Sequence, residues 1–245
     1  MRKAAVVLLL VLLTGCTGAP APPAFTDARA LADAATAATT AGGSAKFSTD
    51  VAVGQVRSKG QGQARFGPGG TSQVMTTDFI GEPMELRLVA GKLYAKVPEG
   101  SRDEVGAGKP WVAVAADGTD PFSQVLGGSL AQLAAQNDPA HTLGEIRTAG
   151  SIVSAERGQL DGVAAEHYRV ELDLSRLGAD LPAGLPAGSA GRFPVELWLD
   201  DARRPLQVVL DLSPILQGGE ARITTRYREW GAPVDVQPPP AGEVG

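Results

Sequence analysis

The sequence predicts an α+β fold dominated by one curved antiparallel sheet whose helices cover a single face. Runs of alternating apolar and polar residues, typical of strands with one buried face, occupy 44–97 and 168–227. Segments with helical features lie before the first stretch and between the two. The 31 glycines and 18 prolines fall mainly between these runs and near the chain ends, which indicates hairpin turns instead of disorder.

The composition is that of a globular protein, with 43% apolar, 20% charged and 5% aromatic residues. A single cysteine excludes a disulfide within the chain and any zinc site that needs two thiolates. The net charge of −5, without a block of five like charges, argues against binding to a phosphate backbone. We therefore expect no nucleic-acid partner.

The first residues have the pattern of an export signal. Arg2 and Lys3 precede an unbroken apolar run over 4–13, which as a helix would rise only about 15 Å, half of a bilayer core of about 30 Å. The run ends in Leu13-Thr14-Gly15-Cys16, which resembles a bacterial lipobox at all four positions. The resemblance implies cleavage before Cys16 and diacylglyceryl attachment to its thiol.

These features divide the chain into four parts. Residues 1–15 are predicted to be a signal peptide, and 16–25 the lipidated cysteine with a Pro-rich tether that reaches roughly 25 Å. Residues 26–236 form one domain, and 237–245 a flexible tail. We expect the protein to be lipid-anchored on the extracytoplasmic face of the cell membrane, because several acyl chains hold durably where one binds marginally.

The first predicted element is a helix that Thr26 caps and that runs to about Thr40, where Gly42-Gly43 ends it. A meander of about five antiparallel strands follows over 44–97. Its turns are expected at the glycine-containing breaks. These breaks are Lys59-Gly60, Gly67-Pro68-Gly69-Gly70, Gly81 and Ala90-Gly91-Lys92.

A helical insert comes next. Asp120-Pro121 and Asp138-Pro139 each place a capping carboxylate before a proline at the first helical position, which predicts helices over Pro121–Gln136 and Pro139–Ala149. Strands then resume, with a turn over 200–205 and a flexible loop over Gly178–Gly191. Their alternating apolar positions are centred on 168–174, 193–199, 206–212 and 221–227.

The order of these segments, together with four short stretches, resembles the actinobacterial LppX/LprA/LprF/LprG lipoproteins over roughly residues 26–236. The stretches are LDGV at 160–163, HYRVELD at 167–173, PVELWLD at 194–200 and PL at 205–206. In that family, as in carriers of the LolA/LolB type, a half-barrel sheet wraps its helices around a cavity for acyl chains. The resemblance therefore implies a half-barrel that binds or transfers acylated lipids or glycolipids at the cell envelope, where a lipid transporter is a candidate partner.

The residues themselves offer candidates for the wall of such a cavity. Apolar side chains of the insert would face apolar side chains of the meander, and each buried methylene contributes about 0.8 kcal/mol. The candidates are Val125, Leu126, Leu130 and Leu133 from the insert, and Met84, Leu86, Leu88 and Leu93 from the meander. The same leucines also suit a filled core, which would make the protein a structural or sensory surface lipoprotein with a packed interior.

Catalytic chemistry finds little support in the sequence. His141 and His167 both fall at positions where we expect solvated side chains, and no spacing suits a metal. Ser129 and Ser189 each lie in a motif that lacks one glycine of a nucleophile elbow. A hydrolase would need one of these serines within hydrogen-bond reach of a histidine. We expect a monomeric carrier that is not an enzyme and holds no metal and no cofactor.

Overall fold

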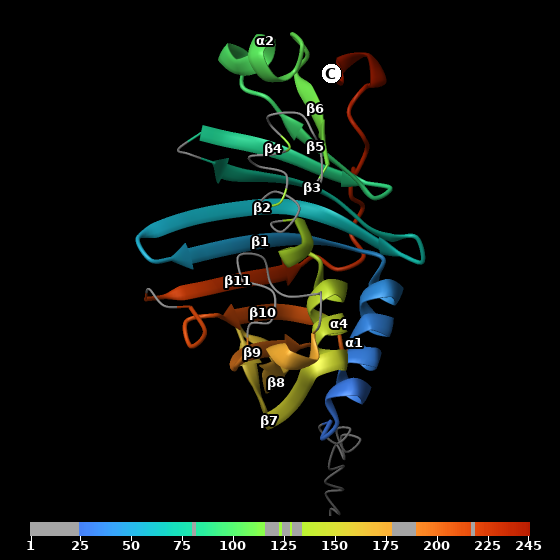
Figure 1. The fold of residues 1–245 in the computed structure, drawn as a ribbon. Helices are drawn as coiled ribbons and strands as arrows, with labels where there is room; N and C mark the ends of the chain where they lie inside the picture. The colour runs from blue at the N-terminus through green and yellow to red at the C-terminus, as the bar shows by residue number, and fades with distance from the viewer. Residues whose placement is uncertain are drawn as a thin grey trace, which may run out of the picture.

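A computed structural model of the chain describes residues 25–79, 82–115, 123, 128, 134–177, 190–216 and 219–245. Its centre is one antiparallel sheet in the order β6-β5-β4-β3-β2-β1-β11-β10-β9-β8-β7, drawn from top to bottom in Figure 1. The sheet curves but does not close on itself, so β6 and β7 form its two edges. The strands are β1 (Ser44–Val53), β2 (Val56–Gly67), β3 (Gly70–Phe79), β4 (Glu82–Val89), β5 (Lys92–Lys96), β6 (Trp111–Val114), β7 (Gly150–Leu160), β8 (Val163–Asp173), β9 (Arg192–Leu199), β10 (Pro205–Asp211) and β11 (Ala221–Arg228).

Two α-helices cover the concave face of the lower part of this sheet. Helix α1 (Ala28–Gly42) and helix α4 (Pro139–Ala149) pack side by side and contact β7; α4 also contacts β8 (Figure 1). Leu31, Leu143 and Ile146 of these helices are completely or almost completely buried, as are Tyr168 and Phe193 of the strands behind them. This arrangement confirms the predicted fold class, a curved sheet with helices on one face.

The helix boundaries follow from their capping residues. Pro139–Ala149 has the predicted bounds, and the Asp138 carboxylate accepts a hydrogen bond from the Ala140 N–H at 2.9 Å. Helix α1 is capped by Asp27, not Thr26 as predicted, because the Asp27 carboxylate reaches the Ala30 N–H at 2.7 Å. Gly43, with φ of +71°, ends α1. The predicted helix over Pro121–Gln136 lies for the most part outside the described residues.

The first meander has five strands as predicted, with one turn displaced. The break expected at Lys59-Gly60 is wrong: β2 runs through it, and the chain turns instead at Gly54-Gln55. Glycine within β2 makes room for a neighbour, because a Cβ on Gly62 would lie 2.7 Å from Cζ of the buried Phe47 ring. The turns before Gly70 and after Ala90 are found as predicted, and Gly81 lies outside the described residues.

Both edge strands went unpredicted. Strand β7 is exposed along almost its whole length and so lacks apolar alternation, while β6 is four residues long. Two short helical turns, η1 (Glu99–Ser101) and α2 (Arg102–Val105), connect β5 to β6, and a third, η3 (Leu174–Arg176), follows β8. The remaining strands, β8 to β11, correspond to the four predicted runs.

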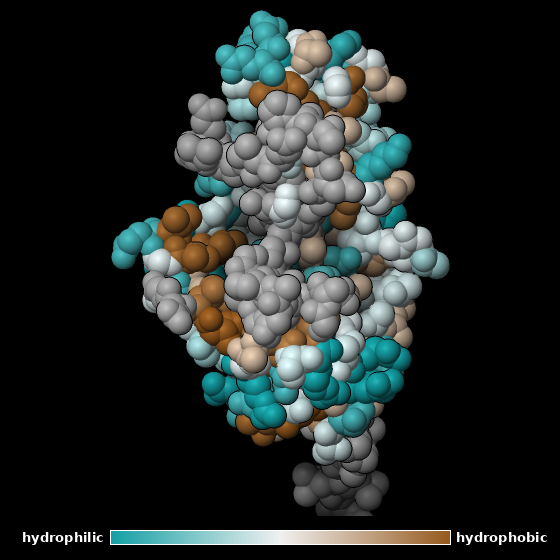
Figure 2. All heavy atoms as spheres, viewed as in Figure 1, coloured by the Kyte–Doolittle hydropathy of each residue, from teal (hydrophilic) through white to brown (hydrophobic). Residues whose placement is uncertain are grey.

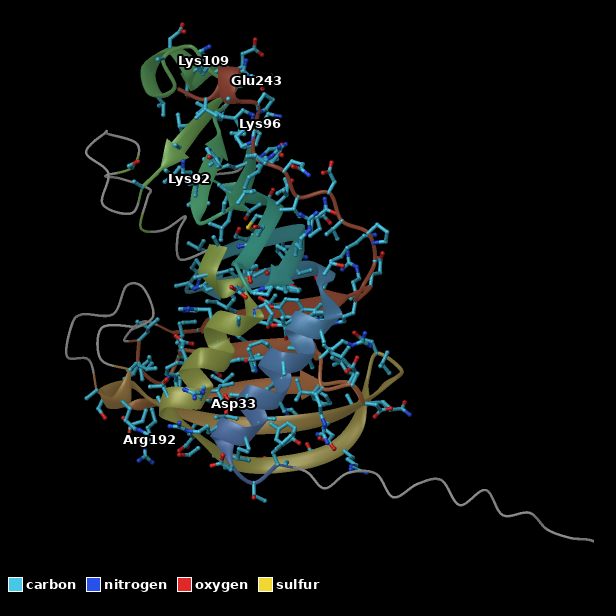
Figure 3. All side chains as sticks on the ribbon, turned by 90° about the vertical axis from the view of Figure 1, so that its right-hand side faces the viewer. Asp33, Lys92, Lys96, Lys109, Arg192 and Glu243 are labelled. Atoms are coloured by element: carbon cyan, nitrogen blue, oxygen red, sulfur yellow. The ribbon has the colours of Figure 1, made fainter. Side chains whose placement is uncertain are left out.

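The C-terminal segment after β11 has a defined place on the sheet, although its composition predicts a flexible tail over 237–245. It follows the face opposite the helices up to β6 and includes the turn η4 (Ala241–Glu243) (Figures 1 and 3). Gln63 on β2 and Arg87 on β4 donate to backbone carbonyls of this segment at 2.6 and 3.2 Å. At its end Val244 forms a parallel bridge with Trp111.

Candidate ligand pocket

A pocket of about 550 Å³ opens on the concave face of the upper sheet, above the start of α4. Its floor follows from strand register: Gln73 lies opposite Leu88, Leu88 opposite Leu93, and Leu93 opposite Val114. Because residues directly opposite each other point to the same side of a sheet, these four side chains form one row across β3 to β6. Leu88, Leu93 and Val114 line the pocket, so most of its floor is apolar.

The wall opposite this floor comes from the chain that leads into α4. Ala134 and Ala135 add small apolar surfaces, and the Asp138 and His141 side chains make this wall polar. Burial raises the pKa of the Asp138 carboxyl above its usual value, an effect that hydrogen bonds from Thr71 and the Ala140 N–H reduce. The His141 Nε2 atom lies 3.6 Å from a carboxylate oxygen of Glu145, one helical turn further on.

A buried polar cluster holds this wall in place. Asn137 is fully buried; its Nδ2 donates to the Met75 sulfur at 3.3 Å, and its Oδ1 accepts from the Thr49 hydroxyl. The Tyr227 hydroxyl donates to the Asn137 carbonyl at 3.3 Å. Burial, with a smaller contribution from the charge of Asp138, raises the Tyr227 pKa well above its usual value. The Tyr227 hydroxyl therefore stays protonated and can act as the donor.

The structure brings together only some of the predicted site residues. Leu88 and Leu93 line the pocket as proposed, whereas Met84 and Leu86, on the same face of β4, are buried in the core away from it. Val125, Leu126, Leu130, Leu133 and the lipidation residue Cys16 lie outside the described residues.

The sequence did not point to several lining residues. Ala113 and Val114 lie on β6, which is too short to show a period of two, and Asp138 was assigned only a capping role. His141, expected to be solvated, is 39% exposed and lines the pocket. The other histidine, also expected to be solvated, is neither free nor fully exposed: His167 stacks on Trp198 with ring centroids 4.0 Å apart.

Within the described ranges, no three His, Cys, Asp or Glu side chains are grouped so that they could hold a metal ion. In the same part of the chain, no helix has the length and apolar character that crossing a membrane requires. Ser129 and Ser189, the two candidate nucleophiles, lie outside the described residues.

Comparison with known proteins places the fold. No family model matches the chain, and no curated protein matches it in sequence. Among solved structures, the lipoprotein LppX of Mycobacterium tuberculosis is similar over 86% of this chain and 98% of its own, with a TM-score of 0.53 and 15% identity. The chain has the LppX fold. LprF of Mycobacterium bovis matches over 86% of this chain and 96% of its own, with a TM-score of 0.49 and 16% identity.

The LppX fold accounts for the shape of the site. An open sheet with helices over part of its concave face leaves the rest of that face to enclose a pocket. Here α1 and α4 contact β7, and α4 also contacts β8, while the pocket lies in front of β4 to β6.

Proposed function

We propose that the protein is a membrane-anchored lipoprotein that binds and carries an acylated lipid or glycolipid in this pocket at the cell envelope. The observation that carries the proposal is an apolar pocket of about 550 Å³ on the concave face of an LppX-like sheet. Pockets for small ligands typically measure about 300–1,000 Å³. The protein acts by binding and release and catalyses no reaction.

The energetics favour an acyl chain as the occupant. At about 0.8 kcal/mol for each buried methylene, a sixteen-carbon chain gains on the order of 10 kcal/mol before the costs of association. The floor of Leu88, Leu93 and Val114 presents no charge to such a chain. Lys92, which is exposed, lies at the rim on the concave side of the sheet, where a polar head group would meet water (Figure 3).

The proposed anchor is Cys16, and the tether after it ends where the folded domain begins. The Phe25 N–H donates to the Tyr168 hydroxyl at 3.1 Å, so the chain enters the domain beside β8. The pocket lies toward the other end of the sheet (Figure 1). We infer that the pocket is held away from the membrane that anchors it, on the extracytoplasmic side, where an envelope lipid transporter could exchange ligand with the monomer.

Native mass spectrometry tests this function. Delipidated protein is mixed with an envelope lipid extract, and one bound lipid per chain is expected. Leu93→Trp, which fills the pocket floor, should lose at least nine-tenths of the bound fraction. Val153→Trp, at a 57% exposed position on β7, is the matched control and should bind as the wild type does. Absence of any lipid on the wild type, or equal loading of Leu93→Trp, contradicts the proposal.

One observation favours the alternative of a structural or sensory lipoprotein. Where α1 and α4 contact β7 and β8, their side chains Leu31, Leu143 and Ile146 are buried in the core, so that part of the interior is filled. If the alternative holds, the pocket stays empty in the presence of the extract. The two functions therefore predict opposite spectra in the same experiment.

A further inference from the structure

Gln73 on β3 has an acceptor that the fold itself does not use. The side chain is 1% exposed, and its Nε2 donates to the Ala134 carbonyl at 2.6 Å. That bond sets the orientation of the amide, because only the nitrogen can donate to a carbonyl. Its Oε1 is buried and, within the described part of the chain, has no hydrogen-bond partner. Buried acceptors without a partner are rare in folded proteins, and each calls for an explanation.

The position of Gln73 connects this acceptor with the pocket. Gln73 is the inner member of the row that continues through Leu88, Leu93 and Val114, the three residues of the pocket floor. The residue that its amide nitrogen holds, Ala134, lines the opposite wall. The Gln73 amide therefore connects the strand beside the floor to a residue of the opposite wall. Gln73 itself is not among the described lining residues, so its amide lies next to the inner end of the pocket.

The charges around this inner end favour a ligand group that donates and carries no negative charge. Asp138 adds carboxylate oxygens to the lining. The His141 Nε2 atom lies 3.6 Å from a carboxylate oxygen of Glu145, so this imidazole already has an acidic neighbour. Among the described lining residues, Lys92 is the one with a positively charged Lys or Arg side chain, and it is exposed at the start of β5. A phosphate or carboxylate at the inner end would meet acceptors, whereas a hydroxyl or an amide N–H would find a partner.

We propose that Gln73 Oε1 accepts a hydrogen bond from an uncharged hydroxyl or amide N–H of the bound lipid. The pocket then selects lipids that carry such a donor next to an acyl chain over lipids of the same chain length that carry none. This inference rests on the proposed carrier function and adds the chemical class of the preferred ligand and the residue that recognises it.

The test compares two probes with the same acyl chain on full-length protein. Sixteen-carbon monoacylglycerol carries two hydroxyls, and the methyl ester of the same acid carries none. We expect the wild type to bind the monoacylglycerol at least tenfold more tightly. Gln73→Met keeps the volume and removes the acceptor, so the preference should fall below threefold while affinity for the methyl ester stays within twofold.

A matched control and a second readout complete the design. Gln63→Met removes a glutamine on β2 that also donates to a backbone carbonyl, that of Asp235 at 2.6 Å, but on the opposite face, and it should keep the full preference. Should Gln73→Met fail to fold, NMR of wild-type glutamine side chains decides: the Gln73 amide resonances must shift with the monoacylglycerol and stay in place with the methyl ester.

The outcomes separate the two proposals. Equal binding of both probes by the wild type, or a tenfold preference that survives in Gln73→Met, overturns the role of Gln73 and leaves the carrier function standing. Failure of the wild type to bind either probe or any lipid of the envelope extract overturns the carrier function itself.

Discussion

Some single residues have structural roles in this fold that their residue type does not suggest. Gly62 is an example, because glycine inside a strand normally weakens it. A Cβ at this position would lie 2.3 Å from the Val74 carbonyl oxygen and 2.7 Å from Cζ of Phe47. The absence of a side chain at Gly62 therefore leaves room for the buried Phe47 ring to lie directly against β2.

We expect Gly62→Ala to destabilise the protein by about 1–3 kcal/mol, the usual cost of overpacking a core, as measured by urea unfolding. Gly158→Ala provides the matched control, since Gly158 also lies within a strand and a Cβ there meets nothing within 4 Å. It should change the free energy of unfolding by less than about 0.5 kcal/mol. Equal losses in the two variants would show that backbone propensity, not space beside Phe47, keeps Gly62.

Asp138 leads to a prediction about pH. Burial raises the pKa of its carboxyl in the folded state above the usual value of 3.8, so this group favours folding below that pH and loses its favourable contribution as pH rises through the folded-state pKa. Asp138→Asn keeps a good N-cap and removes the titration. Relative to wild type, its stability should therefore rise between pH 3.5 and pH 7.

Unfolding curves of both proteins at several pH values measure this difference. Asp27→Asn makes the same change of side chain at the exposed N-cap of α1 and serves as the comparison. A relative stability of Asp138→Asn that falls from pH 3.5 to pH 7 would contradict the assignment of burial as the dominant cause.

Among the elements of the fold, the C-terminal segment makes contacts with the sheet that the sequence does not predict. Side chains of β2 and β4 and the turn before β6 donate to its backbone: Gln63 to Asp235, Arg87 to Gln237 and Lys109 to Gly242. Its final N–H, on Gly245, donates to the Trp111 carbonyl at 2.9 Å. The segment thus lies across the same strands whose other face forms the pocket.

Removing residues 237–245 should loosen this part of the sheet and leave the rest unchanged. Hydrogen exchange is expected to quicken in β5 and β6, because Trp111, now 3% exposed, loses its cover, while β8 to β10 keep their protection. Arg57→Gln, which breaks an exposed ion pair with Glu220, is the comparison and should leave both regions as they are. Uniform loss of protection over the whole sheet would contradict a local role.

Elements that have a buried face and enough length to show its period were predictable, whereas the two edge strands lack one or the other and were not. The predicted bounds of helix α4 agree with the structure to the residue, because Asp138-Pro139 specifies both the cap and the first turn. Strand β7 was not predicted, since its exposed side chains show no alternation. The turn at Gly54-Gln55 was expected instead at Lys59-Gly60, through which β2 continues. Register between distant strands, such as β1 with β11, has no local signal at all.

The pocket was predictable only in part for the same reason. Leu88 and Leu93 follow the period of their strands, and the family resemblance directed attention to them. Gln73, Asp138 and Asn137 are polar residues whose roles depend on tertiary contacts: an amide held by Ala134, a cap at a pocket wall, and a link from Thr49 to Tyr227. None of these contacts can be inferred from spacing along the chain.

On the scale of the whole molecule, one sheet serves two purposes. In front of β7 and β8 the concave face is covered by α1 and α4, whose buried side chains join those of the strands in one core. In front of β4 to β6 the same face borders the pocket. Figure 2 shows apolar side chains gathered at one rim of the molecule as well, where Val53 and Val56 at the tip of the β1–β2 hairpin are 44% and 66% exposed.

We expect lipid to enter the pocket in front of β4 to β6 and to bind at no other apolar surface. A sixteen-carbon lipid with a photoreactive group on its acyl chain, crosslinked to the full chain and mapped by mass spectrometry, tests it most directly. We expect labels on peptides that contain Leu88, Leu93, Val114 or Ala134, and competition by unlabelled lipid. Labels confined to the exposed hairpin at Val53 and Val56, or labelling that unlabelled lipid does not reduce, would contradict the account.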